Sequence, residues 1–204
     1  RFYGVLKAVR ERSKLKRIIV SNIKEALPTL MSLLFTLLKE KKEGHRVETL
    51  DERDVWMKDL LKKCENAPRP KIDISPEDTA LFQYSGGTTG IPKGAVAMHK
   101  NVVANTLQMR AWFVNSEDGK ETFLIGIPLF HVYGMVAGMS VAMAMGASMV
   151  LIPNARDLKD VLENIDKYKP TIFPGVPLLY NGINNHVDVK AGKYNLSSIK
   201  ACIS

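Results

Sequence analysis

One glycine-rich window of the sequence holds residue types that suit phosphate binding. It carries four of the chain's 14 glycines and reads Tyr84-Ser85-Gly86-Gly87-Thr88-Thr89-Gly90-Ile91-Pro92-Lys93-Gly94. Glycines let the backbone come close to a ligand and point successive N–H groups at one anion. Hydroxyl side chains add short donors, and Lys93 adds a mobile positive charge. The window therefore predicts a cradle for polyphosphate, with a ligand-free surface turn as the alternative.

The spacing of this window differs from the two common nucleotide-binding loops. A P-loop requires Gly-Lys-Ser/Thr, whereas Pro92 precedes Lys93 and Gly94 follows it. A dinucleotide fingerprint opens a helix, whereas residues 95–98 are expected to form a strand. Strand, glycine-rich loop and strand together predict a flap that binds through its backbone and hydroxyls.

The elements around this window alternate between strands and helices. Strands are expected at 122–127, 148–152, 171–173 and 199–203, and helices at 133–145, from Asp157 to 165, and at 178–184. Gly146 is expected to cap the first of these helices. The pattern predicts an α/β fold with mostly parallel sheets that helices cover on both faces.

The first third of the chain has a different character. We expect a short strand at 18–20 and one helical face formed by Trp56, Met57, Leu60, Leu61 and Cys64. The Pro-containing segment 66–70 breaks the chain. It predicts a partial first subdomain at 1–70, with an apolar insert, and an α/β core at 71–204.

Two apolar stretches require a membrane test. Leu27–Leu38 has 12 residues, too few to cross a bilayer, and Lys39, Lys41 and Lys42 follow it. It is either an interfacial helix or an ordinary core helix, and the sequence leaves both open. The stretch 132–152 has no charge, but Gly146 divides it into a buried helix and a strand.

Charge and cysteine content limit the function further. The net charge is +8, and residues 1–71 hold all of the excess, with 18 basic and 10 acidic side chains. Such an excess suits an anionic surface, but no aromatic-studded motif accompanies it, so we expect no nucleic-acid partner. Cys64 and Cys202 lie too far apart in sequence for a disulfide framework or a zinc site, and no metal-ligand set is expected.

Three motifs together resemble a known family. SGGTTGIPKG is similar to the AMP-binding signature of adenylate-forming enzymes, which include acyl-CoA synthetases, luciferases and adenylation domains of peptide synthetases. The segments at 128–134 (PLFHVYG) and 173–177 (FPGVP) resemble the family's two following motifs. Within the family, QYSGGTTGIPKGAV, FHVYGM, MVLIP and SSIKACIS most resemble bacterial long-chain fatty-acid–CoA ligases.

The resemblance implies roles for named residues. ATP phosphates would be bound by Tyr84, Ser85, Gly86, Gly87, Thr88, Thr89, Gly90 and Lys93, and the acyl pocket would be lined by His131, Tyr133, Gly134 and Gly175. Thr88, Lys93 and His131 would be catalytic. A structural histidine in a strand-end turn is the alternative for His131. The implied cofactors and co-substrates are ATP, Mg²⁺ and coenzyme A.

The implied reaction joins a long-chain fatty acid to coenzyme A through an acyl-adenylate. Other adenylate-forming enzymes, for medium-chain or aryl acids or in peptide synthetases, are the alternatives, as is a non-catalytic nucleotide-binding or membrane-associated module. The family's adenine, ribose and metal contacts would follow Ser204, so we expect an interior fragment that is inactive alone. We expect a cytoplasmic protein, with peripheral contact at the inner membrane face left open.

Overall fold

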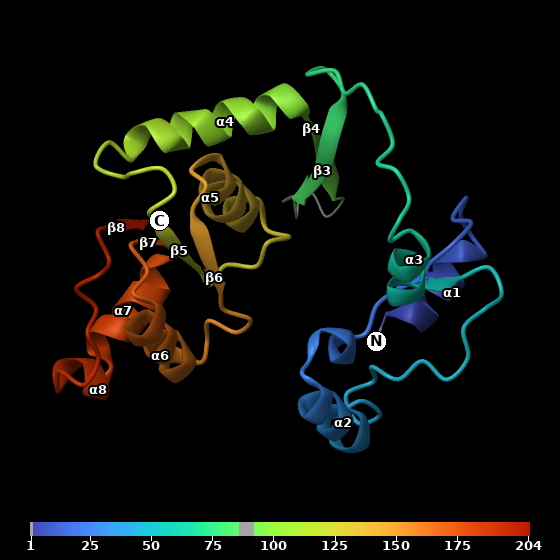
Figure 1. Cartoon of the computed structure of the whole chain (residues 1–204), viewed down its shortest axis with the longest axis horizontal. Coiled ribbons are helices and arrows are strands. Elements are labelled where there is room, and N and C mark those ends of the chain that lie inside the picture. Colours follow the sequence, from blue (N-terminus) through green and yellow to red (C-terminus); the bar gives the residue numbers. More distant parts are fainter. Residues whose placement is uncertain (1, 86–91) are drawn as a thin grey trace. The chain divides into compact units, whose positions relative to one another are not determined.

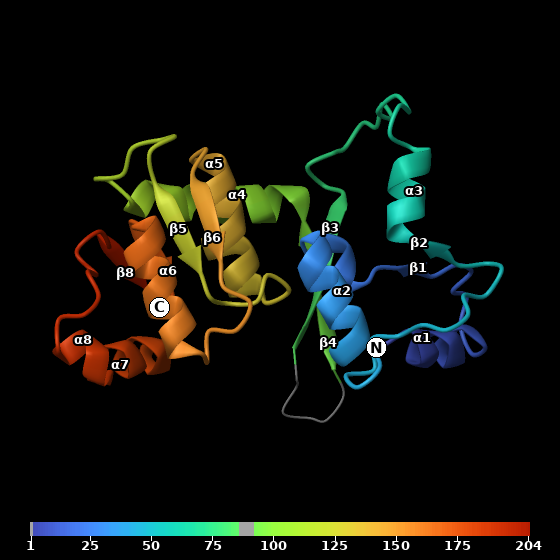
Figure 2. The ribbon, with the colours of Figure 1, turned by 60° about the horizontal axis from the view of Figure 1, so that its bottom comes forward.

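The computed structural model of the chain describes residues 2–85 and 92–204. The chain divides into two compact units, Arg1–Ile72 and Asp73–Ser204. Figures 1 and 2 show both units with their elements labelled.

The first unit is built from short elements. These are α1 (Tyr3–Arg10), β1 (Ile19–Val20), the 3-10 helix η1 (Ile23–Ala26), α2 (Thr29–Leu38), β2 (Val55–Trp56) and α3 (Met57–Lys63). β1 and β2 pair in parallel, with Val20 opposite Trp56. The prediction that Trp56 begins a helical face is therefore wrong, because the backbone of Trp56 is extended and joins the strand pair. The helix starts one residue later.

A buried polar network holds the first unit together. The guanidinium of Arg10 pairs with Asp54 at 2.7 Å and with Asp51 at 2.9 Å. The Tyr3 hydroxyl and the Ile18 N–H also donate to Asp54, at 2.8 and 2.9 Å. These bonds tie α1 to β1 and to the segment before β2. The network matters because Ile18 and Val20 are the buried apolar side chains among the described residues of this unit.

The second unit contains a hairpin and a parallel sheet. Its elements are β3 (Thr79–Ser85), β4 (Lys93–Met98), α4 (His99–Trp112), β5 (Thr122–Ile125), the π-helix η2 (Gly134–Ser140), α5 (Val141–Ala144), β6 (Ser148–Leu151), α6 (Leu158–Tyr168), β7 (Ile172–Pro174), α7 (Pro177–Asn185), α8 (Val187–Lys190) and β8 (Ala201–Ile203). β3 and β4 are antiparallel. The other four strands form a parallel sheet in the order β6-β5-β7-β8.

Strand β5 places apolar side chains on both faces of that sheet. Leu124 packs with α6 and α7 on one face, in a cluster that includes Leu162 and Phe173. Phe123 and Ile125 point to the other face and pack with α5 in a cluster that includes Val141. Figure 2 shows α6 and α5 on these opposite sides. The predicted α/β fold, with a parallel sheet covered on both faces, is confirmed.

The stretch 132–152 has the predicted order of helix, turn and strand, with one difference. Most of the first half of the helical part is a π-helix, over Gly134–Ser140, and an α-helix follows it over Val141–Ala144. Gly146 has a φ of +60°, the left-handed conformation that a helix-ending glycine adopts readily. Within the described residues, no helix has the length and apolar character needed to cross a membrane.

Glu121 ties the amino ends of several strands together. Its carboxylate accepts hydrogen bonds from the Glu117 N–H at 3.0 Å and from Lys200 Nζ at 3.1 Å. Burial alone raises the pKa of Glu121, but bonds from Thr171, the Glu117 N–H and Lys200 outweigh burial and lower the pKa below its ordinary value. The ionised carboxylate therefore joins the start of β5 to the residue before β8.

We expect Glu121→Gln to destabilise the second unit at pH 7 by about 1–3 kcal/mol, because charged hydrogen bonds are lost. The folded pKa lies below the unfolded value of about 4.3, so this contribution is complete above that pH and is lost as pH falls through the folded pKa. Urea unfolding at pH 7 and pH 3 should show a smaller difference between variant and wild type at pH 3.

Glu163→Gln is the matched control for Glu121→Gln. Glu163 makes an exposed pair with Lys159 at 3.7 Å, and such pairs contribute little to stability. An equal loss of stability in both variants, or a difference that does not change with pH, would contradict the role given to Glu121.

Candidate functional site

The β3–β4 hairpin carries the described part of the predicted phosphate-binding window. Ser85 pairs with Lys93 and Tyr84 with Gly94 across the two strands. A Cβ on Gly94 would lie 3.1 Å from the Tyr84 ring, so the glycine lets that ring lie against the partner strand. Tyr84 and Lys93 are exposed. The two strands predicted on either side of the window are present, and they pair with each other.

Most of the residues predicted to form the phosphate cradle lie outside the part of the chain that the structure describes. Gly86, Gly87, Thr88, Thr89 and Gly90 lie outside the described residues. Their roles in phosphate binding, and the catalytic role of Thr88, stay predictions. Lys93 is the first residue of β4, and its side chain is exposed.

The predicted acyl-pocket residues lie at the carboxyl edge of the parallel sheet. His131 and Tyr133 belong to the segment between β5 and η2, Gly134 begins η2, and Gly175 follows β7. Loops at the carboxyl ends of parallel strands form the ligand-binding edge of α/β sheets. The topology therefore brings all four residues to one edge, although they come from two loops 41 or more residues apart in sequence.

One backbone carbonyl at this edge accepts three donors. The Ile203 oxygen lies 2.6 Å from the Tyr133 hydroxyl, 2.7 Å from the Tyr180 hydroxyl and 2.9 Å from the Gly175 nitrogen. The Tyr180 hydroxyl also lies 2.7 Å from the Phe173 oxygen, so its single hydrogen is shared between two carbonyls. The contacts join the loop after β5, the end of β7 and the end of β8.

Both tyrosine hydroxyls remain donors at neutral pH. Burial raises the pKa of Tyr133, and burial together with the nearby Cys202 thiol raises that of Tyr180 further. Tyr180 was missed in the sequence, since it lies on α7 and outside the three motifs. Tyr180 lies seven residues after Phe173, on the helix that follows the third motif, and this spacing is the sequence feature from which its contact with that motif could have been predicted.

Two glycines of the site permit backbone approaches that a side chain would block. A Cβ on Gly134 would lie 2.5 Å from the Pro128 oxygen, which fixes the tight return of the chain from β5 into η2. A Cβ on Gly175 would lie 2.7 Å from the Tyr180 ring. Backbone packing therefore favours glycine at both positions, and the acyl-pocket role predicted for them stays a prediction.

His131 combines a structural contact with an exposed ring. Its Nδ1 accepts the Tyr133 N–H at 3.2 Å, which stabilises the turn. The side chain is exposed, and within the described part of the chain its Nε2 makes no hydrogen bond. The structural role proposed as the alternative for His131 is thus present, and Nε2 remains available to a ligand.

Exposed apolar side chains accompany these polar groups. Phe130 is 85% exposed and Leu178 is 83% exposed, and each follows the carboxyl end of a parallel strand. Such side chains are suited to contact an apolar ligand at this edge.

The candidate site residues form two groups, one on the β3–β4 hairpin and one at the carboxyl edge of the parallel sheet. Among residues 2–85 and 92–204, no hydrogen bond or ion pair joins Tyr84 or Lys93 to His131, Tyr133 or Gly175. The same residues contain no group of three His, Cys, Asp or Glu side chains placed to hold a metal ion.

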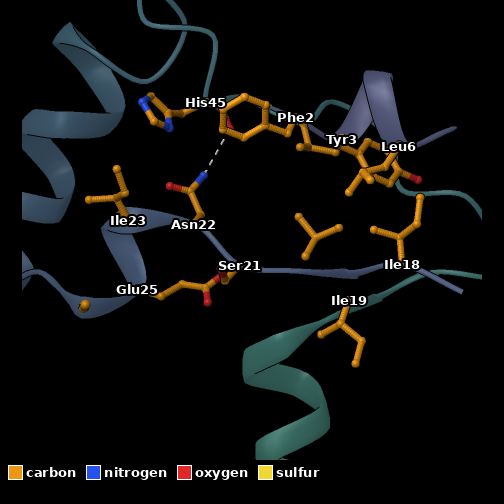
Figure 3. Close-up of a pocket in the computed structure, with 13 residues that line it drawn as sticks. Phe2, Tyr3, Leu6, Ile18, Ile19, Ser21, Asn22, Ile23, Glu25 and His45 are labelled. Atoms are coloured by element: carbon orange, nitrogen blue, oxygen red, sulfur yellow. Dashed lines mark hydrogen bonds between the residues drawn. The ribbon is translucent and has the colours of Figure 1, made fainter. Parts of the chain in front are cut away.

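A groove of about 730 Å³ lies in the first unit, away from these motifs in sequence. Figure 3 shows Leu6 and Ile18 along its apolar wall, and Asn22 Nδ2 donating to the His45 carbonyl at 3.3 Å. None of the predicted site residues lines the groove. It therefore does not carry the chemistry predicted for the three motifs.

Two comparisons identify relatives of the sequence. The family model described as "AMP-binding enzyme" matches residues 6–204. A long-chain-fatty-acid–CoA ligase of Bacillus subtilis (strain 168) is 38% identical over 192 residues, which covers 92% of this chain and 33% of that protein. One from Escherichia coli O6:H1 is 35% identical over 117 residues, which covers 57% of this chain and 21% of that protein. The chain thus spans about a third or less of these relatives.

Solved structures support the fold. ATP-bound MatB from Rhodopseudomonas palustris matches 98% of this chain and 37% of its own, with a TM-score of 0.66 and 19% identity. The fatty acyl-adenylate ligase from Legionella pneumophila, in complex with acyl adenylate and pyrophosphate, matches 80% of this chain and 29% of its own, with a TM-score of 0.63 and 20% identity. With the parallel sheet, the hairpin and the family match over residues 6–204, the chain belongs to the AMP-binding family of adenylate-forming enzymes.

Proposed function

We propose that this chain is part of an acid–thiol ligase that activates a long-chain fatty acid with ATP and transfers it to coenzyme A. The observation that carries the substrate class is the 38% identity, over 92% of the chain, to a protein named long-chain-fatty-acid–CoA ligase. The exposed apolar side chains of Phe130 and Leu178 at the carboxyl edge agree with an apolar substrate.

The proposed reaction has two steps. A carboxylate oxygen of the fatty acid attacks the α-phosphorus of ATP, and the bond to the β,γ-pyrophosphate breaks. The coenzyme A thiol then loses its proton and attacks the acyl carbon, and AMP leaves with the oxygen that the carboxylate contributed. Both steps are transfers between bound groups, so the protein mainly positions the reactants and stabilises developing charge.

Lys93 is the described residue best suited to the first step. Its ammonium group is on an exposed side chain at the base of the glycine-rich loop. Negative charge develops on the leaving pyrophosphate, and a lysine in this position would stabilise that charge. The backbone N–H groups and hydroxyls of the loop from Ser85 to Gly90 would bind the same phosphates.

His131 is proposed to orient the carboxylate of the fatty acid. Its Nδ1 accepts a hydrogen bond from the Tyr133 N–H, and this bond holds the ring in one orientation on the turn. Nε2 would then contact the substrate. Tyr133, Gly134 and Gly175 would shape the acyl pocket beside it, with the Tyr133 hydroxyl fixed by the Ile203 carbonyl.

Mg²⁺ is proposed only as the counter-ion that ATP brings. The described residues contain no group of three His, Cys, Asp or Glu side chains that could hold a metal ion, and Mg²⁺ that accompanies ATP is held largely by phosphate oxygens and water. Coenzyme A is proposed as the second substrate.

We expect Lys93→Ala in the full enzyme to lower the rate of fatty-acid-dependent ATP–pyrophosphate exchange by ~10²–10³, the usual effect of removing a donor to developing negative charge. The melting temperature should stay unchanged, because the Lys93 side chain is exposed. Lys100→Ala is the matched control, since Lys100 pairs with Glu77 at the surface and has no proposed contact with ATP. Exchange by Lys93→Ala within a few-fold of wild type would refute the role of Lys93.

Two substitutions separate the roles of His131. An asparagine at 131 can accept the Tyr133 N–H as an Asx-turn does, but it lacks the imidazole. If Nε2 contacts the substrate, both His131→Ala and His131→Asn should lower the exchange rate by about tenfold or more, with little change in melting temperature. Recovery of the wild-type rate in His131→Asn would show instead that the histidine only stabilises the turn.

A further inference from the structure

The helix α2 presents an apolar face outside the core of the first unit. Leu30, Leu33, Leu34, Leu37 and Leu38 follow the spacing of one helical face, and they are between 42% and 71% exposed. A surface helix of a globular protein normally exposes polar residues to solvent, whereas α2 exposes its leucines. The prediction left open an interfacial or a core helix, and the exposure of these leucines excludes the core helix within this unit.

The orientation of α2 is fixed from its opposite side. The Phe35 ring packs edge-on against His45, with 5.7 Å between ring centroids. Just after the helix, the buried Glu40 accepts a hydrogen bond from Asn22 Nδ2 at 2.8 Å and pairs with Lys24 at 2.7 Å. That bond to Lys24, more than any other contact, lowers the pKa of Glu40 despite its burial, so the carboxylate stays charged. The leucines therefore face outward because the fold holds them there.

Basic side chains lie beside the apolar face. Lys39, Lys41 and Lys42 follow the end of the helix, and all three are exposed. No acidic residue occurs from Ala26 to Lys39, Glu40 is already paired, and one exposed acidic residue, Glu43, follows the three lysines with its carboxylate 3.7 Å from His45 Nε2. The surface formed by the α2 leucines and these three lysines is thus apolar and positively charged at once.

We propose that α2 docks on the surface of an anionic lipid bilayer, with its leucines among the acyl chains and the three lysines at the headgroups. Ten residues of helix are about 15 Å long, half the thickness of the hydrocarbon core, so the helix lies in the interface instead of crossing it. A second copy of the chain, paired through the same face, is the less favourable occupant, because that face offers the three lysines no cluster of acidic residues, whereas an anionic bilayer offers them its headgroups.

The test measures binding of the full chain to vesicles of phosphatidylglycerol and phosphatidylcholine, and to vesicles of phosphatidylcholine alone. Binding should favour the anionic vesicles and weaken in 0.5 M salt, because screening reduces attraction between charges. Lys39→Glu, Lys41→Glu and Lys42→Glu combined should weaken binding by at least about tenfold, since each basic residue near the surface contributes to the attraction. The control reverses three exposed lysines of α3, Lys58, Lys62 and Lys63, and should stay within about threefold of wild type.

The apolar part is tested by Leu33→Ser with Leu37→Ser. This variant should lose most vesicle binding and keep its melting temperature, because both side chains lie outside the core. Leu61→Ser, at an exposed leucine on α3, should bind like wild type. Equal binding by the α2 and α3 variants would overturn the proposal. So would the absence of vesicle binding together with a dimer in sedimentation velocity that the leucine substitutions dissociate, a result that would assign the face to a second copy.

Discussion

The second unit depends on the burial of both faces of strand β5. Phe123 and Leu124, consecutive residues of one short strand, enter two separate apolar clusters, so each face of the strand needs the helices on its own side to be buried. A parallel sheet requires this arrangement, because its crossover connections place helices on both faces. The same arrangement brings the loops after β5 and β7 to one edge. The location of the candidate acyl site is therefore a consequence of how the core is packed.

Hydrogen bonds to one backbone carbonyl then order that edge. The Ile203 carbonyl accepts from the loop after β5 through Tyr133, from α7 through Tyr180 and from the end of β7 through Gly175. Protonated phenols supply two of these bonds, and no charge is involved, so the arrangement is insensitive to salt and to pH near neutrality. The hairpin with Lys93 makes no such bonds to the edge within the described residues. Under the proposed function, phosphate binding and acyl binding would use separately positioned elements, and the substrates would bridge them.

The α/β class could be predicted because, after residue 120, segments with the apolar spacing of strands alternate with segments that have the spacing of helices. In this part of the chain the tertiary packing agrees with the apolar spacing of each segment. The prediction misplaced Trp56, since a two-residue strand is set by pairing with Val20 and carries no periodic signal. It missed Tyr180, because the partners of its hydroxyl are backbone atoms of Phe173 and Ile203, which no motif reveals. It left α2 ambiguous, since an apolar helix has the same composition whether buried or exposed. Only the contacts of Phe35 and Glu40 on its other side decide which way the leucines face.

The central claim is that the enzyme containing this chain forms an acyl-adenylate by attack of a carboxylate oxygen on the α-phosphorus of ATP. The most direct test supplies the full enzyme with a long-chain fatty acid labelled with ¹⁸O in both carboxylate oxygens, together with ATP and coenzyme A, and follows the label by mass spectrometry. The proposed reaction predicts one labelled oxygen in AMP, one in the thioester and none in pyrophosphate. Label in inorganic phosphate, with ADP as the nucleotide product, would show attack at the γ-phosphorus and would contradict the account.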